Sequence, residues 1–402
     1  GVPATDTIRM AVPVEDHRLM VLSDHYLTFV KDQVELVTKA FAHTDVYVRY
    51  HPATEISRIL PDPRLKAFRK DSLIDRENLP VNVSIHPLPL FYLPCDHQFK
   101  RAGKRYYNAV ENRLQRSGTY PDLIHAHFVW PNGFVGAKLK EEYGIPFIIT
   151  AHGYDIYDLP FRDAEWKERI EAILNVADVV ITVSNSNREC AEKLDVTTPV
   201  KVVPNGFRHD LFYPMIRETC KNALNLPVGR KIILSVGNLM EVKGHVYLID
   251  AMSEVIRKRM DVLCLIIGRG ELKHKLEEEI SSSGLEQYVH LIGGKPHGEI
   301  PLWMNACDLF VLPSLRESFG IVQVEAMACG IPVVATRNGG SEEIVIPGKT
   351  GLLCAAGDSQ GLAECIVRAL DTPWDAGAIA KEARFYSWEN VGKEILRMYR
   401  SI

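Results

Sequence analysis

Residues 309–336 read LFVLPSLRESFGIVQVEAMACGIPVVAT, and this stretch decides the fold. It begins with a continuous apolar run, Leu309–Leu312, and passes through a loop into a helical pattern over Phe319–Cys329. A second apolar run, Pro332–Thr336, follows. Runs without polar alternation are typical of strands buried on both faces of a parallel sheet. With Ser318 in the position of an N-cap, the stretch predicts a strand–helix–strand unit.

The same alternation of short apolar runs and longer helical patterns extends along the rest of the chain. Further strands are expected at Leu19–Ser23, Asp45–Tyr50, Val81–His86, Leu123–His127, Phe147–Thr150, Val179–Val183, Lys201–Pro204, Lys231–Gly237, Val262–Gly268 and Val289–Ile292. Further helices are expected at Val30–Ala42, Lys100–Arg116, Gly133–Tyr143, Glu165–Val176, Asn187–Lys193, His245–Lys258, Leu272–Ser282, Ser359–Leu370 and Trp388–Arg400. This spacing predicts doubly wound α/β sheets.

The length of 402 residues favours two domains or more. Turn-forming residues gather between two of the expected strands, at Pro204–Gly206, Pro214 and Pro227–Gly229. We therefore expect two doubly wound domains of similar size, with their boundary in this segment. Ligands of such sheets bind beyond the carboxyl ends of the strands, and in a two-domain protein these ends can face one another across a cleft.

The charge and the apolar content exclude several classes of protein. The 47 Lys+Arg residues against 51 Asp+Glu give a net charge of −4, whereas nucleic-acid-binding proteins usually have a basic excess. No stretch approaches the about 20 apolar residues that span a bilayer, and the first residues lack the features of a signal peptide. None of the 8 cysteines has C-x-x-C spacing, and most lie in apolar runs, as free core thiols do. A cytoplasmic location is therefore expected.

Two glutamates bracket the start of the helix expected after Leu312. Glu317 lies on the loop at the carboxyl edge of the sheet, and Glu325 lies about two turns along the helix. Free N–H groups near Phe319 and Gly320 would present partial positive charge to an anion such as a diphosphate. The carboxylates could accept hydrogen bonds from vicinal hydroxyls of a sugar or a ribose. On spacing alone, two surface glutamates near a helix start are an equally good interpretation.

The segment around these glutamates resembles the retaining glycosyltransferases of group 1, also called family 4, which have the GT-B fold. In that family two glutamates with seven residues between them are embedded in a segment like ESFGIVQVEAMACGIPVVAT. Matching motifs occur at Asp122–His127, Thr150–Asp155, Val203–Phe207, Phe212–Pro214, Ser235–Leu239, Lys243–Gly244, Asn338–Ile344 and Gly348–Leu353. The ordered set, which extends over residues 120–400, is far more specific than any single motif.

The resemblance implies a GT-B architecture, in which two Rossmann-like doubly wound domains face one another across a cleft. Residues 1–205 would be an acceptor-binding domain, residues 206–384 a nucleotide-sugar-binding domain, and residues 385–402 a helix that packs back on the first domain. The implied reaction is transfer of a sugar from a nucleotide sugar to an acceptor hydroxyl, with retention of anomeric configuration. Residues His25–Gln33 resemble a variant found in a subgroup that serves surface polysaccharides, which implies cell-surface polysaccharide, glycolipid or glycan synthesis.

The resemblance also implies roles for particular residues. The implied catalytic residues are His152 and Glu317, and the implied nucleotide-sugar-binding residues are Asn238, Lys243, Phe319, Gly320 and Glu325. Glu317 would contact hydroxyls of the donor sugar, Glu325 would contact the ribose, and His152 would face the donor sugar from the first domain. Lys243 and the backbone N–H groups of Phe319 and Gly320 would hold the diphosphate, because lysine binds phosphate as a point charge.

The sequence departs from the family at one site position, since Asn238 stands where a phosphate-binding arginine is common. An asparagine can donate a hydrogen bond but carries no charge, which puts donor affinity in question. No metal is expected at the site, because no D-x-D-type pair lies at a cleft edge. No cofactor is expected either, and the co-substrate is expected to be a UDP- or GDP-sugar.

Other functions remain open at this point. One is a sugar-nucleotide epimerase or a phosphorylase on the same fold, and another is an inactive nucleotide-sugar-binding subunit, which Asn238 suggests. A glycosidase-like pair of carboxylates is a further alternative, although seven intervening residues could place Glu317 and Glu325 too far apart. His125 and His127 could ligate a metal, but two ligands are too few for a convincing site.

Residues 91–116 combine apolar and basic side chains. Phe91–Pro94 precede a helix whose basic residues are Lys100, Arg101, Lys104, Arg105, Arg113 and Arg116. Its apolar residues recur at helical spacing on the other face, as Phe99, Ala102, Tyr106, Val110 and Leu114. This pattern is compatible with an interfacial helix at the inner face of the cell membrane, and equally with an ordinary amphipathic helix. The expected partners are a nucleotide sugar and a carbohydrate or lipid-linked acceptor, with a membrane surface as a further partner on the first of these two interpretations and no nucleic acid.

Overall fold

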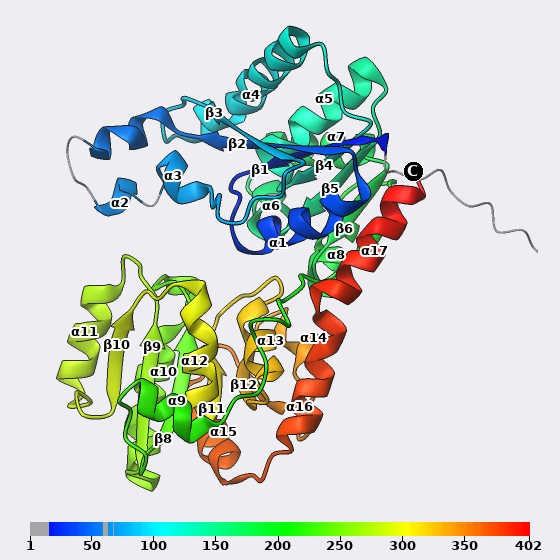
Figure 1. Cartoon of the computed structure of the whole chain (residues 1–402). Helices are drawn as coiled ribbons and strands as arrows, with labels where there is room; N and C mark the ends of the chain where they lie inside the picture. The colour runs from blue at the N-terminus through cyan, green and yellow to red at the C-terminus, as the bar shows by residue number, and fades with distance from the viewer. Residues whose placement is uncertain (1–15, 59–62, 67) are drawn as a thin grey trace, which may run out of the picture. The chain divides into compact units, whose positions relative to one another are not determined.

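The computed structural model describes residues 16–58, 63–66 and 68–402, and Figure 1 shows its helices and strands. These residues form two compact units. Unit 1 contains the described residues up to Val183, together with Asn187–Val203 and Gly392–Ile402, and unit 2 contains Ser184–Ser186 and Pro204–Val391. The resemblance implied boundaries after residues 205 and 384, and the compact units divide after Val203 and after Val391. The N-terminal residues in which no signal peptide was expected lie outside the described part.

Unit 1 is built on a seven-stranded parallel sheet. Its strands are β1 (Arg18–Ser23), β2 (His43–Tyr50), β3 (Val83–Pro89), β4 (Leu123–His127), β5 (Phe147–Ala151), β6 (Val179–Thr182) and β7 (Val200–Val202). Its helices are α1 (Thr28–Val37), α2 (Pro63–Lys66), α3 (Lys70–Leu73), α4 (Asp96–Ser117), α5 (Phe134–Tyr143), α6 (Tyr154–Tyr157), α7 (Ala164–Val176) and α8 (Asn185–Glu192). Short 3-10 turns cover Thr38–Ala40, Pro52–Arg58 and Leu159–Phe161, and a π-helical turn covers Val129–Gly133.

The strand order in unit 1 is β3-β2-β1-β4-β5-β6-β7. The chain starts at β1, winds outward to β3, and returns past β1 to β4, so the direction of winding reverses between β1 and β4. Right-handed crossovers then place α1 on one face of the sheet and α4, α5 and α7 on the other, as Figure 1 shows. This order confirms the doubly wound sheet that the apolar runs predicted.

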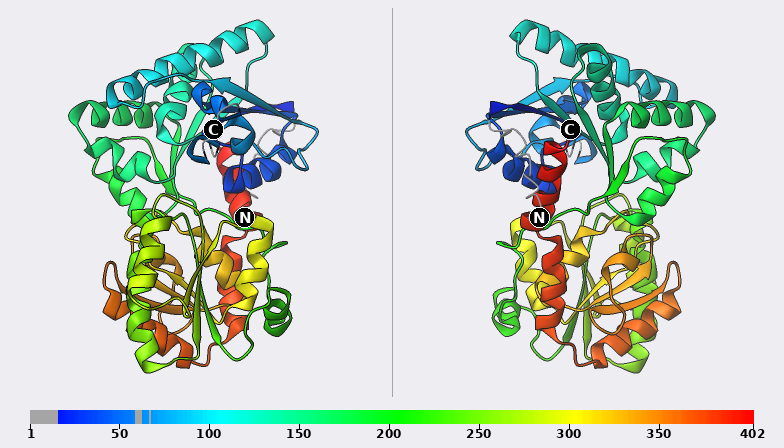
Figure 2. Two further views of the ribbon diagram at one scale, coloured as in Figure 1. Left: turned by 90° about the vertical axis from the view of Figure 1, so that its left-hand side faces the viewer. Right: turned by 90° about the vertical axis from the view of Figure 1, so that its right-hand side faces the viewer.

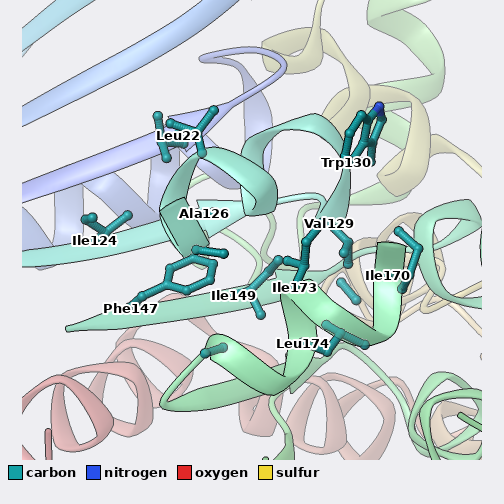
Figure 3. Packing of buried hydrophobic residues seen from close by; sticks show 14 of the residues in the cluster. Leu22, Ile124, Ala126, Val129, Trp130, Phe147, Ile149, Ile170, Ile173 and Leu174 are labelled. Atoms are coloured by element: carbon teal, nitrogen blue, oxygen red, sulfur yellow. The ribbon is translucent and has the colours of Figure 1, made fainter. Parts of the chain in front are cut away.

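The core of unit 1 lies between the sheet and helices α4, α5 and α7. Figure 3 shows Ile149 of β5 beside Ile173 of α7, and both are almost fully buried. The chain approaches closely here because Gly133 has no side chain: a Cβ at that position would lie 2.3 Å from Cδ1 of Ile149. Helix α4 contributes the apolar face that the sequence predicted, with Ala102, Tyr106, Val110 and Leu114 all buried. Burying one such large side chain contributes about 1.5–3 kcal/mol.

The last helix, α17 (Trp388–Arg400), contributes its C-terminal part to unit 1. Gly392 allows it to pack on α1, because a Cβ at Gly392 would lie 1.9 Å from Cδ2 of Leu36. Farther along the helix, the hydroxyl of Tyr399 lies 2.5 Å from Nδ1 of His125 in β4. The helix therefore packs on α1 through Gly392 and on the sheet through Tyr399, whose hydroxyl contacts β4.

Unit 2 is built on a six-stranded parallel sheet in the order β10-β9-β8-β11-β12-β13. Its strands are β8 (Lys231–Val236), β9 (Val262–Ile267), β10 (Val289–Gly293), β11 (Leu309–Leu312), β12 (Val333–Arg337) and β13 (Gly351–Ala355). Its helices are α9 (Arg217–Ala223), α10 (His245–Lys258), α11 (Lys273–Ser282), α12 (Ile300–Ala306), α13 (Ile321–Ala328), α14 (Ser341–Ile344), α15 (Ser359–Asp371) and α16 (Ala376–Ala383), with 3-10 turns at Glu241–Lys243, His297–Glu299 and Arg384–Tyr386. In both views of Figure 2, helices flank each sheet on its two faces.

Several short elements of unit 2 were not predicted. Strand β13 has 5 residues and begins with Gly351, a residue that is depleted in strands. A Cβ at Gly351 would lie 1.8 Å from the carbonyl oxygen of Val333, so the glycine lets β13 lie close to β12. Helices α9 and α12 have 7 residues each, which is too short to display the 3.6-residue period on which sequence prediction depends.

No helix among the described residues is long and apolar enough to cross a membrane.

Candidate functional site

The residues that the sequence analysis expected to bind a nucleotide sugar lie in unit 2, near the point where the direction of winding of the sheet reverses. The order β9-β8-β11-β12 places β8 and β11 side by side, and Leu309 and Phe310 of β11 pair with Ile233 and Leu234 of β8. All strands are parallel, so the loops after β8 and β11 leave the sheet at the same edge. Open α/β sheets bind their ligands at this position, beyond the carboxyl ends of the strands.

Gly244 brings the loop after β8 onto the loop after β11. This glycine has a φ of +66°, and a Cβ on it would lie 2.1 Å from the carbonyl oxygen of Pro313. Next to this contact the N–H of Leu315 donates to the carbonyl of Val242 at 2.8 Å. The Lys-Gly pair that the sequence singled out thus docks Lys243 beside the residues that follow β11.

Lys243 and Glu317 form an ion pair in this position. The Nζ atom of Lys243 lies 2.7 Å from Oε1 of Glu317, and the hydroxyl of Ser314 donates to the same oxygen at 2.7 Å. The Glu317 side chain is only 9% exposed and that of Lys243 is 28% exposed. The nearly buried carboxylate of Glu317 therefore has a cation and a hydroxyl as partners. Such partners are needed because burying an unpaired charge is costly. The structure brings these two predicted residues together.

The loop that precedes α14 forms a hydrogen bond with the backbone of Glu317. The N–H of Glu317 donates to the carbonyl of Asn338 at 2.9 Å. The side-chain oxygen of Asn338 accepts from the N–H groups of Gly340 and Ser341, at 3.1 and 2.9 Å. Neither Ser314 nor Asn338 was assigned a role from the sequence, although Asn338 opens one of the family motifs. The contact of Asn338 with Glu317 joins two separate loops, which no local pattern shows, whereas Ser314 lies in the same loop as Glu317, three residues before it.

Helix α13 begins later than predicted. Its first residue is Ile321 and its N-cap is Gly320, whose φ of 77° is in the left-handed region; the predictions of Ser318 as N-cap and of Phe319 as first residue were wrong. The physical reason is that a residue with positive φ separates Phe319 from the helix, a conformation that glycine adopts readily. The amide of Gln323 then donates to the carbonyl of Phe319 at 2.9 Å. In the first turn the N–H of Gln323 donates to the carbonyl of Gly320 at 3.1 Å, so the N–H groups that helix geometry leaves without a helical partner there are those of Ile321 and Val322.

Phe319 contributes to this site through its backbone. Its side chain is 4% exposed, and its ring lies 5.5 Å from that of Tyr386. Gly340 has no side chain to push this backbone away, since a Cβ there would lie 2.8 Å from the carbonyl oxygen of Phe319. The predicted anion-binding group is therefore the peptide turn at Phe319–Gly320 together with the first turn of α13.

Glu325 lies in the second turn of α13 and does not share the ion pair of Glu317. Its carboxylate is 8% exposed, and Oε1 lies 2.9 Å from Nε2 of His297. The two predicted carboxylates thus have different basic partners. His297 was missed from the sequence because it lies 28 residues before Glu325 in the chain.

Asn238 lies in the loop directly after β8 and is exposed. The next residue, Leu239, is buried and its N–H donates to the carbonyl of Arg269 at 2.9 Å, which anchors the loop. Behind the loop lies the buried ring of His245, whose pKa burial lowers to about 4, so that the ring is neutral near pH 7. Asn238 and His245 therefore add hydrogen-bonding groups but no charge next to Lys243.

His152 lies in unit 1, directly after β5. Its ring packs against Phe29 and Phe128, with ring centroids 4.8 and 4.7 Å away, and its Nε2 lies 2.9 Å from Nδ1 of His127. Burial lowers the pKa of His152 to about 3, which keeps the ring neutral near pH 7. Its Nδ1 is buried without a hydrogen-bond partner among the described residues. The ring is therefore uncharged, and its Nδ1 can make one hydrogen bond with a ligand.

Asp155 shapes the turn that carries His152. The N–H groups of His152 and Gly153 donate to Oδ1 of Asp155 at 3.1 and 2.7 Å, and the N–H of Val129 donates to Oδ2 at 2.9 Å. The aspartate of the Thr150–Asp155 motif is thus a structural clamp between two loops. Burial raises its pKa to about 6.

His125 and His127 are core residues of unit 1. Nε2 of His125 lies 2.7 Å from the hydroxyl of Thr150, and its ring stacks on that of His127 with centroids 4.5 Å apart. Among the described residues no group of three or more His, Cys, Asp or Glu side chains is placed to hold a metal ion.

The basic face predicted for α4 is smaller than the sequence indicated. Lys100 is 9% exposed and lies within 2.8–3.0 Å of carboxylate oxygens of Asp96, Asp163 and Glu165. The sequence analysis wrongly assigned Lys100 to a solvated basic face. Asp96 lies one turn before it on α4, but Asp163 and Glu165 lie more than sixty residues farther along the chain, at the N-terminus of α7. Arg101, Lys104 and Arg116 are exposed, and so are Phe91 and Leu93, whose side chains are 56% and 55% exposed.

Comparison with known protein families gives two matches. The family described as "Glycosyl transferases group 1" matches residues 216–385, and the family described as "Glycosyltransferase Family 4" matches residues 60–211. An uncharacterized glycosyltransferase of Methanocaldococcus jannaschii is 31% identical over 334 residues, which are 81% of this chain and 87% of that protein. The D-inositol 3-phosphate glycosyltransferase of Corynebacterium urealyticum is 31% identical over 313 residues, which are 72% of this chain and 73% of that protein.

Among solved structures, HepE from Anabaena in complex with UDP is similar with a TM-score of 0.72. The two chains are 21% identical, and the similarity covers 96% of this chain and 100% of HepE. At this level of identity the likeness shows the fold alone. That fold has two Rossmann-like domains and is the GT-B fold.

Proposed function

This chain belongs to the group 1 glycosyltransferases, family 4, and we propose that it transfers a sugar from a nucleotide sugar to an acceptor hydroxyl with retention of the anomeric configuration. The observation that carries the proposal is the ion pair of Lys243 and Glu317, 2.7 Å apart, beside the first turn of α13. A cation, a helix N-terminus and a carboxylate at one sheet edge match a ligand that joins a diphosphate to a sugar.

The proposed chemistry depends on charge that changes during the reaction. When the nucleoside diphosphate leaves the anomeric carbon, negative charge grows on the phosphate oxygens and positive charge grows on the sugar. Lys243 and the N–H groups after Gly320 would stabilise the leaving diphosphate. Glu317 would accept hydrogen bonds from the sugar hydroxyls, and Glu325 would do so from the ribose. Asn238 would donate a neutral hydrogen bond in place of the usual arginine.

We further propose that unit 2 binds the donor and unit 1 binds the acceptor, with His152 taking part in transfer. The donor would be a UDP- or GDP-sugar, which the UDP complex of HepE supports for the uridine nucleotide. The acceptor would be a carbohydrate or a lipid-linked sugar in glycan synthesis. The name of the C. urealyticum relative, a D-inositol 3-phosphate glycosyltransferase, supports a hydroxyl acceptor of this general kind.

The test is a thermal-shift screen followed by a transfer assay. A nucleotide sugar at about 100 times its dissociation constant adds about 2.7 kcal/mol to the stability of the folded state, which raises the unfolding temperature visibly. UDP-, GDP-, ADP- and dTDP-sugars are compared, and the best donor is incubated with sugar acceptors. The expected product has the anomeric configuration of the donor. If none of these donors shifts the unfolding temperature, the proposal is wrong.

The same assay separates the alternatives. An epimerase would convert the nucleotide sugar with no acceptor present, and a phosphorylase would require added phosphate. An inactive subunit, which Asn238 suggests, would bind the donor and release no nucleoside diphosphate. Transfer to a hydroxyl without phosphate would exclude all three.

We also propose that unit 1 contacts a membrane surface through α4 and the residues before it, as an enzyme of the cytoplasm acting at the inner face of the membrane would. The support is that Phe91 and Leu93 before α4 are exposed and that Arg101 and Lys104 on α4 are exposed as well. Changing Arg101, Lys104 and Arg116 to glutamine should abolish binding to vesicles of anionic lipid while donor hydrolysis is unchanged. Lys100 is left unchanged in this variant, because its ion pairs serve the fold. Vesicle binding that is absent, or insensitive to salt, would contradict the proposal.

A further inference from the structure

His297 contacts the buried carboxylate of Glu325 at the edge of unit 2 where the donor is proposed to bind. Its Nε2 lies 2.9 Å from Oε1 of Glu325. An ionised carboxylate only accepts hydrogen bonds, so the histidine donates through Nε2. The histidine side chain is 39% exposed whereas the glutamate side chain is 8% exposed. The pair therefore links the protein interior to the surface at which a ligand would arrive.

The position of the histidine ring is set by two elements that are distant in the sequence. His297 opens the short turn His297–Glu299, which follows β10 and Pro296. Its ring packs against that of Phe212, with centroids 5.3 Å apart. Parallel strands place the carboxyl end of β10 at the same sheet edge as those of β8 and β11. The ring is thus held between Phe212 and Glu325, at the edge that carries Lys243 and Glu317.

The contact has a consequence for the direction of the carboxylate. A glutamate side chain has three rotatable bonds and can point its two oxygens in many directions. A hydrogen bond from His297 to Oε1 restricts the rotation of the carboxylate. The lone pairs of Oε2 then point in one direction. Two vicinal hydroxyls require this kind of preorganisation, because both O–H groups must donate to the same carboxylate at once.

We propose that His297 is a positioning residue that fixes the Glu325 carboxylate for the vicinal hydroxyls of the nucleotide's ribose, and that it thereby sets the preference for ribose over 2′-deoxyribose. The inference rests on the proposed function, because it takes Glu325 as the ribose ligand. A histidine that merely joined α13 to the turn at 297–299 would affect stability and would not alter this preference.

The test measures nucleotide affinity by isothermal titration on the full chain. The probes are two pairs, UDP with 2′-deoxy-UDP and GDP with 2′-deoxy-GDP. The unaltered protein should prefer the ribonucleotide of one pair by about tenfold, the scale of a hydrogen bond to a charged group. His297→Ala should weaken the ribonucleotide and leave the deoxynucleotide nearly unchanged, so that the preference falls below about threefold. His297→Gln should restore most of it, because the glutamine amide also donates.

The matched control is His290→Ala. His290 lies on β10 in the same unit and is exposed, with Nε2 3.0 Å from the carbonyl oxygen of Glu286. This variant should keep the preference of the unaltered protein. In a transfer assay, His297→Ala should raise KM for the donor and leave kcat nearly unchanged, since the ribose is not the reacting part of the donor.

Two results would overturn the inference alone: a His297→Ala variant that binds nucleotides with an unchanged ribose preference, or a His297→Gln variant that behaves like His297→Ala. Failure of the unaltered protein to bind either ribonucleotide would overturn the proposed function, and the inference with it. Unfolding temperatures of all variants, measured alongside, show that each remains folded at the titration temperature.

Discussion

Lys243 and Glu317 form one ion pair, yet we assign them to different parts of the donor. The lysine is assigned to the diphosphate and the glutamate to the sugar, while the two side chains lie 2.7 Å apart. Donor binding must therefore take place around an existing contact, and removal of one partner changes the other. Loss of Lys243 would leave Glu317, at 9% exposure, with Ser314 as its hydrogen-bond donor, whereas loss of Glu317 would leave a lysine that can turn toward water or phosphate.

Glu317→Ala should lower turnover strongly and should not weaken binding of the free nucleoside diphosphate, because it releases the Lys243 cation for the phosphates. Lys243→Ala should damage both nucleotide binding and turnover, since phosphate charge is present in the ground state and grows in the transition state. Isothermal titration with the nucleoside diphosphate and turnover measurements decide. A Glu317→Ala variant that loses nucleotide affinity would show that the glutamate holds the nucleotide instead.

Glu325→Ala should weaken the free nucleoside diphosphate and the nucleotide sugar equally, by about 1.5–3 kcal/mol for a hydrogen bond to a charged group. The reason is that the ribose is common to both ligands and does not change during the reaction. The two affinities are compared by titration under the same conditions. If Glu325→Ala lowers kcat and spares both affinities, the roles of the two glutamates are reversed.

At the scale of the elements, glycines determine how closely the loops of the proposed donor site approach one another. Gly268 follows β9, and a Cβ on it would lie 1.9 Å from the carbonyl oxygen of Gly237, which follows β8. In the structure, Gly268 allows two backbone segments to meet directly behind Asn238.

Gly268→Ala should push apart the ends of β8 and β9 and displace the loop that carries Asn238. The expected cost is about 1–3 kcal/mol of stability, as for other overpacked sites, together with weaker nucleotide binding. Urea denaturation and titration with the nucleoside diphosphate measure the two effects. Gly229→Ala is the control, because no atom lies within 4 Å of a Cβ at that position. Unchanged nucleotide affinity in Gly268→Ala would show that this close approach does not shape the site.

At the scale of the whole molecule, the buried histidines make stability depend on pH. Burial lowers the pKa of His125 to about 3 and that of His152 to about 3, and it also lowers the pKa of His127. The unfolded chain takes up protons near pH 6.5, where these folded histidines do not. Stability is therefore fully present above about pH 6.5 and is lost as the pH falls toward 3. Asp155 opposes this trend, since burial raises its pKa to about 6.

The urea midpoint should accordingly be lower at pH 5 than at pH 7.5. Each histidine that stays neutral in the folded state lowers the free energy of unfolding by up to about 1.4 kcal/mol for each pH unit below its unfolded pKa. The combined effect of three such histidines is larger than the opposite effect of Asp155. His125→Gln removes one titrating group and should make the midpoint less dependent on pH, even though it lowers stability at pH 7.5. A midpoint that does not fall between pH 7.5 and pH 5 would contradict the neutral state of these rings.

Activity should survive treatment with a chelator, because Lys243 and the first turn of α13 are proposed to neutralise the diphosphate. Turnover is measured with EDTA present and again after Mg²⁺ or Mn²⁺ is added. Strict dependence on either ion would show that a metal completes the donor site.

The sequence by itself determined the fold class and the position of most elements. Strand β11 and helix α17 have the bounds that the sequence predicted, because continuous apolar runs and the 3.6-residue period are local signals. The motifs likewise predicted that the loops after β8 and β11 meet, since the carboxyl ends of parallel strands lie at one edge of the sheet. These features require only neighbouring residues or the rules of sheet topology.

The tertiary structure decided which side chains are partners. Lys243 lies 74 residues before Glu317 and His297 lies 28 residues before Glu325, and no local pattern relates the members of either pair. The positive φ of Gly320 makes α13 begin at Ile321 instead of Phe319. Ion pairs with Glu165 of α7 and with its N-cap Asp163 bury Lys100, which therefore does not belong to the basic face. In each case the deciding energy is a contact between segments distant in the chain. A buried charge must find its partner there, and only the packed fold specifies which residue that is.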